Sequence, residues 1–229
     1  MARNQKTNTL WTHNDSGGKP ELYEIDYNGK LLSTLAVPRA RNVDWEDLAQ
    51  SPDGTLYIGD IGNNANTRRD LTIYPLTPSQ EVLAPITFSY ADQQLFPPPG
   101  HQLNFDSEAF FYYQKKLYLF SKNRSKTDRY VMMYALPAQP GHYTLTARDS
   151  VYVDAQVTSA DINPAGTTFA LLTYGKILLF DIVGGEINFD HPTNCIKIGK
   201  MQEEAIIFVN DTDLLITNEQ RNMYLIKRK

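Results

Sequence analysis

The sequence predicts an all-β protein, a β-propeller of four-stranded blades that forms a single domain over residues 1–229. Strand-like segments rich in alternating, β-branched and aromatic residues fill the chain between Gly, Pro, Asn and Asp turns. No segment keeps apolar residues at helical spacing over three turns. A pattern of two strands flanked by polar clusters recurs at intervals of roughly 40 to 60 residues, which suits one blade per repeat.

Each repeat has an acidic or small polar cluster, a strand, a turn, a second strand and another polar cluster. The four copies read "DWEDLAQSPDGTLYIGD", "DSEAFFYYQKKLYLFSK", "TSADINPAGTTFALLTY" and "QEEAIIFVNDTDLLITN". Their leading positions hold Glu46, Glu108, Ala160 and Glu204. Their second strands end at Asp60, Lys122, Tyr174 and Asn218. These units supply the two innermost strands of four blades.

The N-terminal segment adds a fifth unit, in which "LWTHND", "ELYEID" and "LLSTLAV" form the second, third and fourth strands. Its first strand falls within "MARNQ", so its lead acid would precede Met1. At the other end, "QEEAIIFV", "DLLITNEQ" and "MYLIKR" supply only three strands. We therefore expect five blades, or six if an irregular rim segment forms another, with an incomplete last blade. Because an N-terminal strand normally completes the last blade, we also expect that a native N-terminal segment is missing.

Composition excludes several classes of partner. The net charge of −4 provides no basic field for nucleic acid. The single cysteine, Cys195, excludes an intrachain disulfide and a cysteine metal cluster. No apolar run approaches the ~18 residues of a membrane span, and "MARNQKTNTLW" lacks the apolar region of a secretory signal. As written, the sequence indicates a cytoplasmic monomer. A lost N-terminal segment carrying a signal would make the protein secreted or periplasmic.

The polar clusters predict a site at the centre of the ring. In a hairpin that turns at "SPDG", residues equidistant from the turn face one another, so Glu46 is expected opposite Asp60. The same symmetry pairs Glu108 with Lys122. Innermost strands line the central channel, so these ends converge at one mouth. The expected ligand-binding funnel comprises Glu46, Asp47, Asp60, Asn63, Glu108, Lys122, Asp161, Tyr174, Glu204 and Glu219, together with His13, Asn14 and Asp15.

Converging carboxylates repel one another, so a cation, Lys122 or raised pKa values must neutralise them. One interpretation is a calcium site, with the ligands Glu46, Asp60, Glu108 and Glu204. The other is structural: the carboxylates accept hydrogen bonds from amides of neighbouring innermost strands. No G-x-S-x-G elbow is present. The catalytic candidates are therefore His13 as a general base beside Asp15, and Lys122.

The segments "LWTHNDSGG", "DWEDLA…GTLYIGDIGNN", "DSEAFFYY…LYLFSK", "TSADINPAGTTFALLTYG" and "EEAI…LLITNE" resemble a family of uncharacterised bacterial propellers. More distantly they are similar to phytase-like and SdiA-regulated propellers. Phytase-like propellers bind calcium through channel carboxylates and hydrolyse phosphoesters. The resemblance therefore implies a metal role for Glu46, Asp47, Asp60, Glu108 and Glu204. The chain departs from that pattern at Ala160 and in lacking the runs of basic phosphate-binding residues.

Three functions stay open because propellers host all of them. The first is a ligand-binding or scaffold propeller with an acidic funnel that holds calcium and takes a small-molecule or protein ligand. The second is a metal-dependent hydrolase of phosphoesters or lactones, in the manner of phytase-like propellers. The third is a protein-interaction platform that uses the rim and the "FPPPG" loop.

Overall fold

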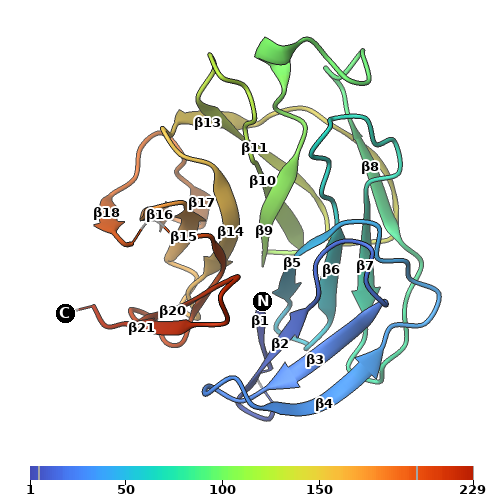
Figure 1. Ribbon diagram of the computed structural model, residues 1–229, viewed down its shortest axis with the longest axis vertical. Coiled ribbons are helices and arrows are strands. Elements are labelled where there is room, and N and C mark those ends of the chain that lie inside the picture. The colour runs from blue at the N-terminus through green and yellow to red at the C-terminus, as the bar shows by residue number, and fades with distance from the viewer. Residues whose placement is uncertain (5, 200, 229) are drawn as a thin grey trace.

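Five small antiparallel sheets stand in a ring and form a five-bladed β-propeller, as predicted (Figure 1). The computed structural model describes every residue except 5, 200 and 229. The predicted first strand "MARNQ" forms a strand at Ala2–Asn4, and its Gln5 lies outside the described residues. Within the described chain, the single helical segment is the short 3₁₀ turn η1 (Gly100–Gln102), so no helix is long enough to cross a membrane.

The blades follow one another along the chain. Blade one has β1 (Ala2–Asn4), β2 (Thr9–His13), β3 (Glu21–Ile25) and β4 (Leu31–Ala36). Blade two has β5 (Trp45–Gln50), β6 (Leu56–Asp60), β7 (Thr72–Leu76) and β8 (Ile86–Tyr90). Blade three has β9 (Ser107–Tyr113), β10 (Lys116–Ser121), β11 (Tyr130–Pro137) and β13 (Asp149–Tyr152). Blade four has β14 (Val157–Ile162), β15 (Thr168–Thr173), β16 (Lys176–Val183), β17 (Glu186–Ile187) and β18 (Asn194–Lys197). Blade five has β19 (Glu203–Phe208), β20 (Leu214–Asn218) and β21 (Met223–Ile226).

Blade two contains one strand from the part of the chain that forms blade three, which the repeat pattern did not predict. β12 (Gly141–Leu145) follows β11 in the chain but pairs in parallel with β8, on the outer edge of blade two. β13 then returns to pair with β11 as the outer strand of blade three. The added strand β12 links the two blades through backbone hydrogen bonds in addition to side-chain packing.

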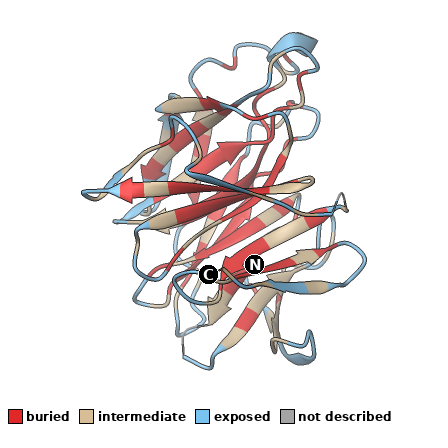
Figure 2. Cartoon of the chain, turned by 90° about the vertical axis from the view of Figure 1, so that its left-hand side faces the viewer, coloured by how far each residue is buried: buried red, intermediate tan, exposed pale blue. Residues whose placement is uncertain are grey.

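Apolar side chains from facing sheets fill the space between neighbouring blades, and buried residues concentrate in the middle of the strands (Figure 2). Between blades three and four, the ring of Phe120 on β10 stacks on the ring of Phe169 on β15, with centroids 5.7 Å apart. The contact between blades one and five is smaller, and its buried centre is formed by Met1, Leu10, Ile207 and Leu215. Side-chain packing therefore contributes to closing the ring at this contact.

A β-bulge interrupts the innermost strand of four blades. The residues skipped in the pairing register are Glu46, Glu108, Thr158 and Glu204. The predicted opposition of Glu46 and Asp60 is therefore wrong, because Trp45 lies opposite Asp60. The hairpin symmetry assumed one residue opposite one residue, whereas a bulge places two residues against one and redirects a side chain.

The bulge also corrects the repeat alignment. Ala160 was aligned with the lead acids, but it pairs regularly with Leu171 on β15. Thr158, two residues earlier, occupies the bulge of blade four. A hydroxyl therefore takes the place that a carboxylate has in the other three bulges.

Candidate functional site

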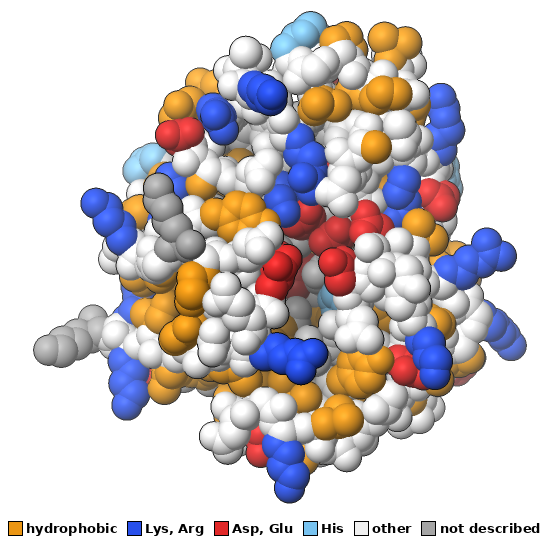
Figure 3. Space-filling model, in the orientation of Figure 1, with side chains coloured by type: hydrophobic (Ala, Val, Ile, Leu, Met, Phe, Trp, Pro, Cys, Tyr) orange, Lys and Arg blue, Asp and Glu red, His pale blue; other side chains and the backbone are white. Residues whose placement is uncertain are grey.

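A cavity of about 910 Å³ opens at the centre of one face of the ring. Figure 3 shows acidic side chains gathered in this hollow, with basic side chains beside them. All four bulge residues line it: Glu46, Glu108, Thr158 and Glu204. The bulges thus direct one side chain from each of four blades into the same space.

Most of the predicted funnel residues lie on the wall of this cavity. Those on the wall are His13, Asn14, Asp15, Glu46, Glu108, Lys122, Tyr174, Glu204 and Glu219. Those absent from the wall are Asp47, Asp60, Asn63 and Asp161. Each member of the second group is held by hydrogen bonds elsewhere in the fold.

Asp47 spans the centre of the ring below the cavity. Its Oδ2 accepts hydrogen bonds from the Ser159 hydroxyl (2.9 Å) and the Ala160 N–H (3.2 Å). Its Oδ1 accepts one from the amino group of Met1 (3.0 Å). Asp47 is on β5 of blade two, and both groups that donate to its Oδ2 are on β14 of blade four. This carboxylate therefore connects two blades that are not neighbours in the ring.

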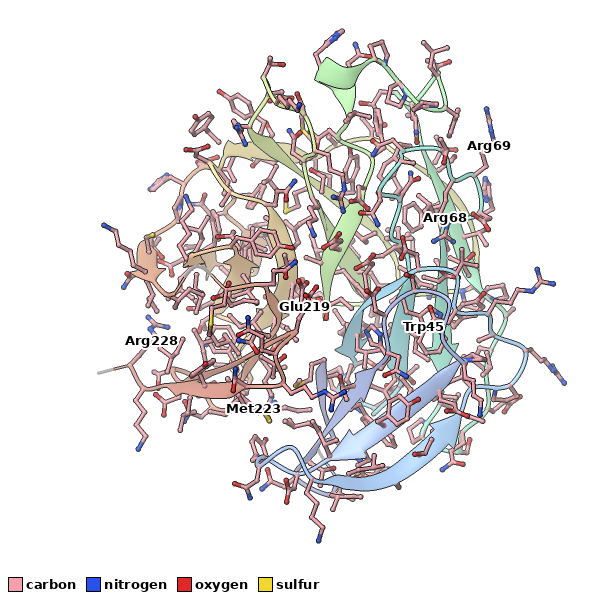
Figure 4. All side chains as sticks on the ribbon, in the orientation of Figure 1. Trp45, Arg68, Arg69, Glu219, Met223 and Arg228 are labelled. Carbon is pink, nitrogen blue, oxygen red and sulfur yellow. The ribbon has the colours of Figure 1, made fainter. Side chains whose placement is uncertain are left out.

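Asp60, Asn63 and Asp161 also stabilise the fold. Asp60 Oδ1 accepts the N–H of Asp44 (2.9 Å) and an N–H of Arg68 (3.0 Å). Arg68 lies over blade two, away from the centre of the ring (Figure 4). The Asn63 side chain accepts two backbone N–H groups of the following loop and donates to the Phe105 carbonyl.

Asp161 joins blades four and five, because its Oδ2 accepts the Phe208 N–H at 2.7 Å. Burial raises the pKa of Asp161 to about 7. These hydrogen bonds match the structural interpretation of the carboxylates, in which they accept amides of neighbouring strands.

One side of the cavity is neutralised by ion pairs. Glu108 pairs with Lys122 and accepts an N–H of Arg124 at 2.8 Å, and Arg124 also pairs with Asp106. Burial and the Asp106 charge raise the pKa of Glu108 to about 7, against the opposing effect of Lys122. Burial acts to lower the pKa of Lys122, but the Glu108 charge outweighs it and leaves that pKa raised. Lys122 therefore remains a buried ammonium.

Near these ion pairs, Glu46 and Asp44 have no cation within salt-bridge distance among the described residues, although the charges of Glu108 and Lys122 act on Glu46. A β-carbon built on Gly62 would collide with Glu46 Oε1 and Asp44 Oδ2, so both carboxylates lie over the α-carbon of this glycine. Among the described residues, neither carboxylate accepts a hydrogen bond that offsets its burial. Burial and the charges of Glu108 and Asp44 raise the pKa of Glu46 well above its ordinary range. Burial and the Asp106 charge raise the pKa of Asp44 to about 6.

Tyr174 connects Lys122 to Glu204 across the cavity wall. Its hydroxyl accepts a hydrogen bond from Lys122 Nζ (3.3 Å) and donates one to Glu204 Oε1 (3.4 Å). Burial raises the pKa of Glu204 despite the opposing charge of Lys122. Glu219 is exposed and lies near the centre of the ring in Figure 4, at the rim of the cavity.

The candidate base His13 lies on the cavity wall, with its ring edge-on to Trp45 at 6.0 Å. Its Nδ1 contacts the Asn14 carbonyl at 2.9 Å, and burial lowers the pKa of His13 to about 4. The imidazole is therefore neutral at pH 7. Asp15 Oδ1 accepts the Ser16 N–H, and no hydrogen bond joins His13 to Asp15 among the described residues, although the Asp15 charge acts on the imidazole.

Of the four carboxylates expected to hold calcium, Glu46, Glu108 and Glu204 face the cavity, whereas Asp60 lies outside it. Asp60 is engaged by Arg68, and Glu108 by Lys122 and Arg124. Over the described part of the chain, no three His, Cys, Asp or Glu side chains are grouped so that they could hold a metal ion. Two of the four predicted ligands, Asp60 and Glu108, are thus paired with cations, and calcium binding stays a prediction.

Sequence reasoning missed several residues of the site. Arg124 and Asp106 lie two positions from Lys122 and Glu108, so their alternation along the strand ends could have suggested them. The sequence pattern gives Gly62 no role. It also aligns Ala160 with the lead acids, so it does not point to Thr158, which occupies the bulge.

No protein-family model matches the chain, and no curated protein matches it in sequence. Among solved structures, the chain is similar to Kuenenia stuttgartiensis hydrazine synthase, with 14% identity and a TM-score of 0.48. The similarity covers 95% of this chain and 54% of that chain, so this chain spans about half the length of its structural neighbour. At this identity and score the similarity carries no functional argument, and the propeller assignment rests on the five sheets.

Proposed function

We propose that this protein is a ligand-binding β-propeller whose funnel takes up a small organic cation. The supporting observation is an imbalance of charge across one cavity. The buried Lys122 and the half-buried Arg124 are already paired with Glu108 and Asp106. Glu46 and Glu204 face the same space without a cationic partner of their own.

Burial strengthens the attraction of such a site for positive charge. Glu46 and Glu204 are desolvated, which raises their pKa values, and a bound ammonium would favour their ionised forms. Because both carboxylates are half-buried, the effective dielectric constant around them is lower than in bulk water and each charge pair is stronger. Binding of a cation should therefore release protons near neutral pH.

The size and lining of the cavity support a small-molecule ligand. Its volume of about 910 Å³ lies within the range of about 300 to 1,000 Å³ that is typical of small-molecule sites. Tyr23, Tyr174 and the edge of Trp45 add aromatic surface to the wall. Aromatic rings beside carboxylates are common partners of ammonium groups.

The experiment is isothermal titration calorimetry with putrescine, arginine and choline, and with butane-1,4-diol as the uncharged counterpart of putrescine. At least one amine is expected to bind, and the diol is not. The variant Glu46→Gln/Glu204→Gln should weaken binding at least about tenfold, because two attractive charges are lost. Glu186→Gln, which neutralises an exposed carboxylate on β17, is the matched control. Absence of binding by all three amines, or unchanged affinity in the double variant, would refute the proposal.

A second candidate is a hydrolase of phosphoesters or lactones, in line with the resemblance to phytase-like propellers. Its support is the raised pKa of Glu46, since burial and neighbouring negative charges that raise the pKa of a carboxyl group suit it to act as a general acid. p-Nitrophenyl phosphate and γ-butyrolactone serve as test substrates, with calcium and with EDTA. Activity that disappears in Glu46→Gln would favour this candidate over simple binding.

Calcium binding is tested by thermal unfolding of the unmodified protein and of Glu46→Gln, with calcium, with magnesium and with EDTA. A ligand that binds only the folded state raises the midpoint by mass action. A rise specific to calcium that is lost in Glu46→Gln would assign the ion to the funnel. An unchanged midpoint would leave the organic cation as the ligand class.

A further inference from the structure

The carboxylates of the funnel that have no ion-pair partner form two separate groups. The inner carboxylates, Glu46 and Asp44, belong to blade two and are half-buried. The rim carboxylates are Glu204 and Glu219 of blade five, and Asp15 of the loop that follows β2. Blade one packs between blades two and five. The inner and the rim carboxylates therefore approach the cavity from blades that are not neighbours in the ring.

The neighbours that act on each group confirm this separation. Burial, and then the charges of Glu108 and Asp44, raise the pKa of Glu46. Burial raises the pKa of Glu204, and the charges of the other two rim carboxylates add to that rise. Lys122 opposes both rises, so its ammonium lies within electrostatic reach of both groups.

A paired cation and a tyrosine lie along the wall between the two groups. Lys122 Nζ pairs with Glu108 and lies 3.3 Å from the Tyr174 hydroxyl, which contacts Glu204 Oε1 at 3.4 Å. The same ammonium lies 5.2 Å from the centroid of the Tyr174 ring. A positive charge of the ligand placed here would be repelled by Lys122, whereas an uncharged chain would not. The wall thus favours positive charge at two places with an uncharged stretch between them.

We propose that the funnel binds a linear diamine, with one ammonium group at the inner carboxylates, the other at the rim carboxylates, and its methylene chain along Tyr174. This inference rests on the proposed function and names the class of cation. A chain that joins two ammonium groups makes the second contact intramolecular, so affinity rises above that of a monoamine and depends on the length of the chain. Arg221 also lines the cavity, but it is exposed to solvent, where salt screens its charge.

The test is isothermal titration calorimetry at pH 7 with three pairs of amines of equal chain length. The pairs are propylamine and 1,3-diaminopropane, butylamine and putrescine, and hexylamine and 1,6-diaminohexane. The tightest diamine is expected to bind at least about tenfold more tightly than its monoamine. Amines that bind equally within every pair would overturn this inference and leave the proposed function standing. Absence of binding by all six would refute both.

Variants at each end of the site test the assignment of the two ammonium groups. Glu46→Gln and Glu204→Gln should each weaken binding of that diamine about tenfold, because each removes one charge pair. The diamine should then bind little better than its monoamine. Glu186→Gln should leave the ratio of the two affinities unchanged, and a ratio that persists in both funnel variants would overturn the inference.

A third variant keeps the inference testable if Glu204→Gln fails to fold. Glu219 is exposed at the rim, near the centre of the ring in Figure 4, so Glu219→Gln should leave the unfolding midpoint unchanged. It should lower the affinity for the diamine about threefold and hardly change that for the monoamine, if the monoamine occupies the half-buried inner carboxylates. Equal losses for the two amines in this variant, together with equal losses in Glu46→Gln, would overturn the inference.

Discussion

The aspartates between the blades and the glutamates of the funnel carry the same functional group but serve different ends. Asp47 and Asp106 are buried and Asp161 is half-buried, and all three accept backbone N–H groups from other blades. Glu46 and Glu204 stand in β-bulges and direct their carboxylates into the cavity. The comparison teaches that the local backbone, and not the density of acids in the sequence, separates carboxylates that hold the ring together from those available to a ligand.

The largest effect is expected when one carboxylate is removed from each region, which tests whether the two groups of carboxylates differ in their contribution to stability. Asp106→Ala leaves the Asn63 N–H and part of the Arg124 guanidinium unpaired, so the free energy of unfolding should fall by about 3 kcal/mol. Glu204→Ala should change it by less than about 1 kcal/mol, because its carboxylate faces the cavity. Urea unfolding at pH 7 measures both values. Similar losses in the two variants would mean that the funnel carboxylates are structural as well.

The second prediction concerns Gly62, which lies beneath the carboxylates of Glu46 and Asp44. Gly62→Ala should displace both, and the fold should tolerate it because the added methyl group meets the ends of flexible side chains. Affinity for the cation should drop about tenfold while the unfolding midpoint stays nearly constant. Gly100→Ala is the control, since a β-carbon there meets no atom within 4 Å. Calorimetry and thermal unfolding together separate a binding effect from a loss of structure.

The smallest effect is expected from the pH dependence of Glu46. Its pKa in the folded state lies above the ordinary value of 4.5, so the folded protein keeps a proton that the unfolded chain releases. The stability contributed by that proton is full below the ordinary value and is lost as the pH rises through the folded-state pKa. Glu46→Gln is neutral at every pH, so it should be more stable than the unmodified chain at pH 8.

This difference should be about 1 kcal/mol at pH 8, because the side chain is partly exposed, and should nearly vanish at pH 4. Urea unfolding at the two pH values checks it. A variant that is less stable at pH 8 would show that the ionised carboxylate already has a partner in the folded protein, which would also remove the main support for a cation site.

The sequence alone determined the number of blades and the order of their inner strands. The repeats that begin at Glu46, Glu108 and Glu204 carry period-two apolar patterns between turn residues, and such patterns depend only on local backbone geometry. The three strands of the last blade were predicted for the same reason. Most of the residues that the sequence predicts for the funnel do lie on the cavity wall, because the ends of innermost strands in a ring must converge.

Only the tertiary structure decided which of those carboxylates face the ligand. The bulges at Glu46 and Thr158 change the register by one residue, and no local pattern in the sequence announces where a bulge falls. The hydrogen bond between Asp47 and Ser159 and the addition of β12 to blade two depend on contacts between segments far apart in the chain. Local sequence therefore determines where the strands form. Which charged groups pair, and which strands lie side by side, depends on the segments that the closed ring brings together.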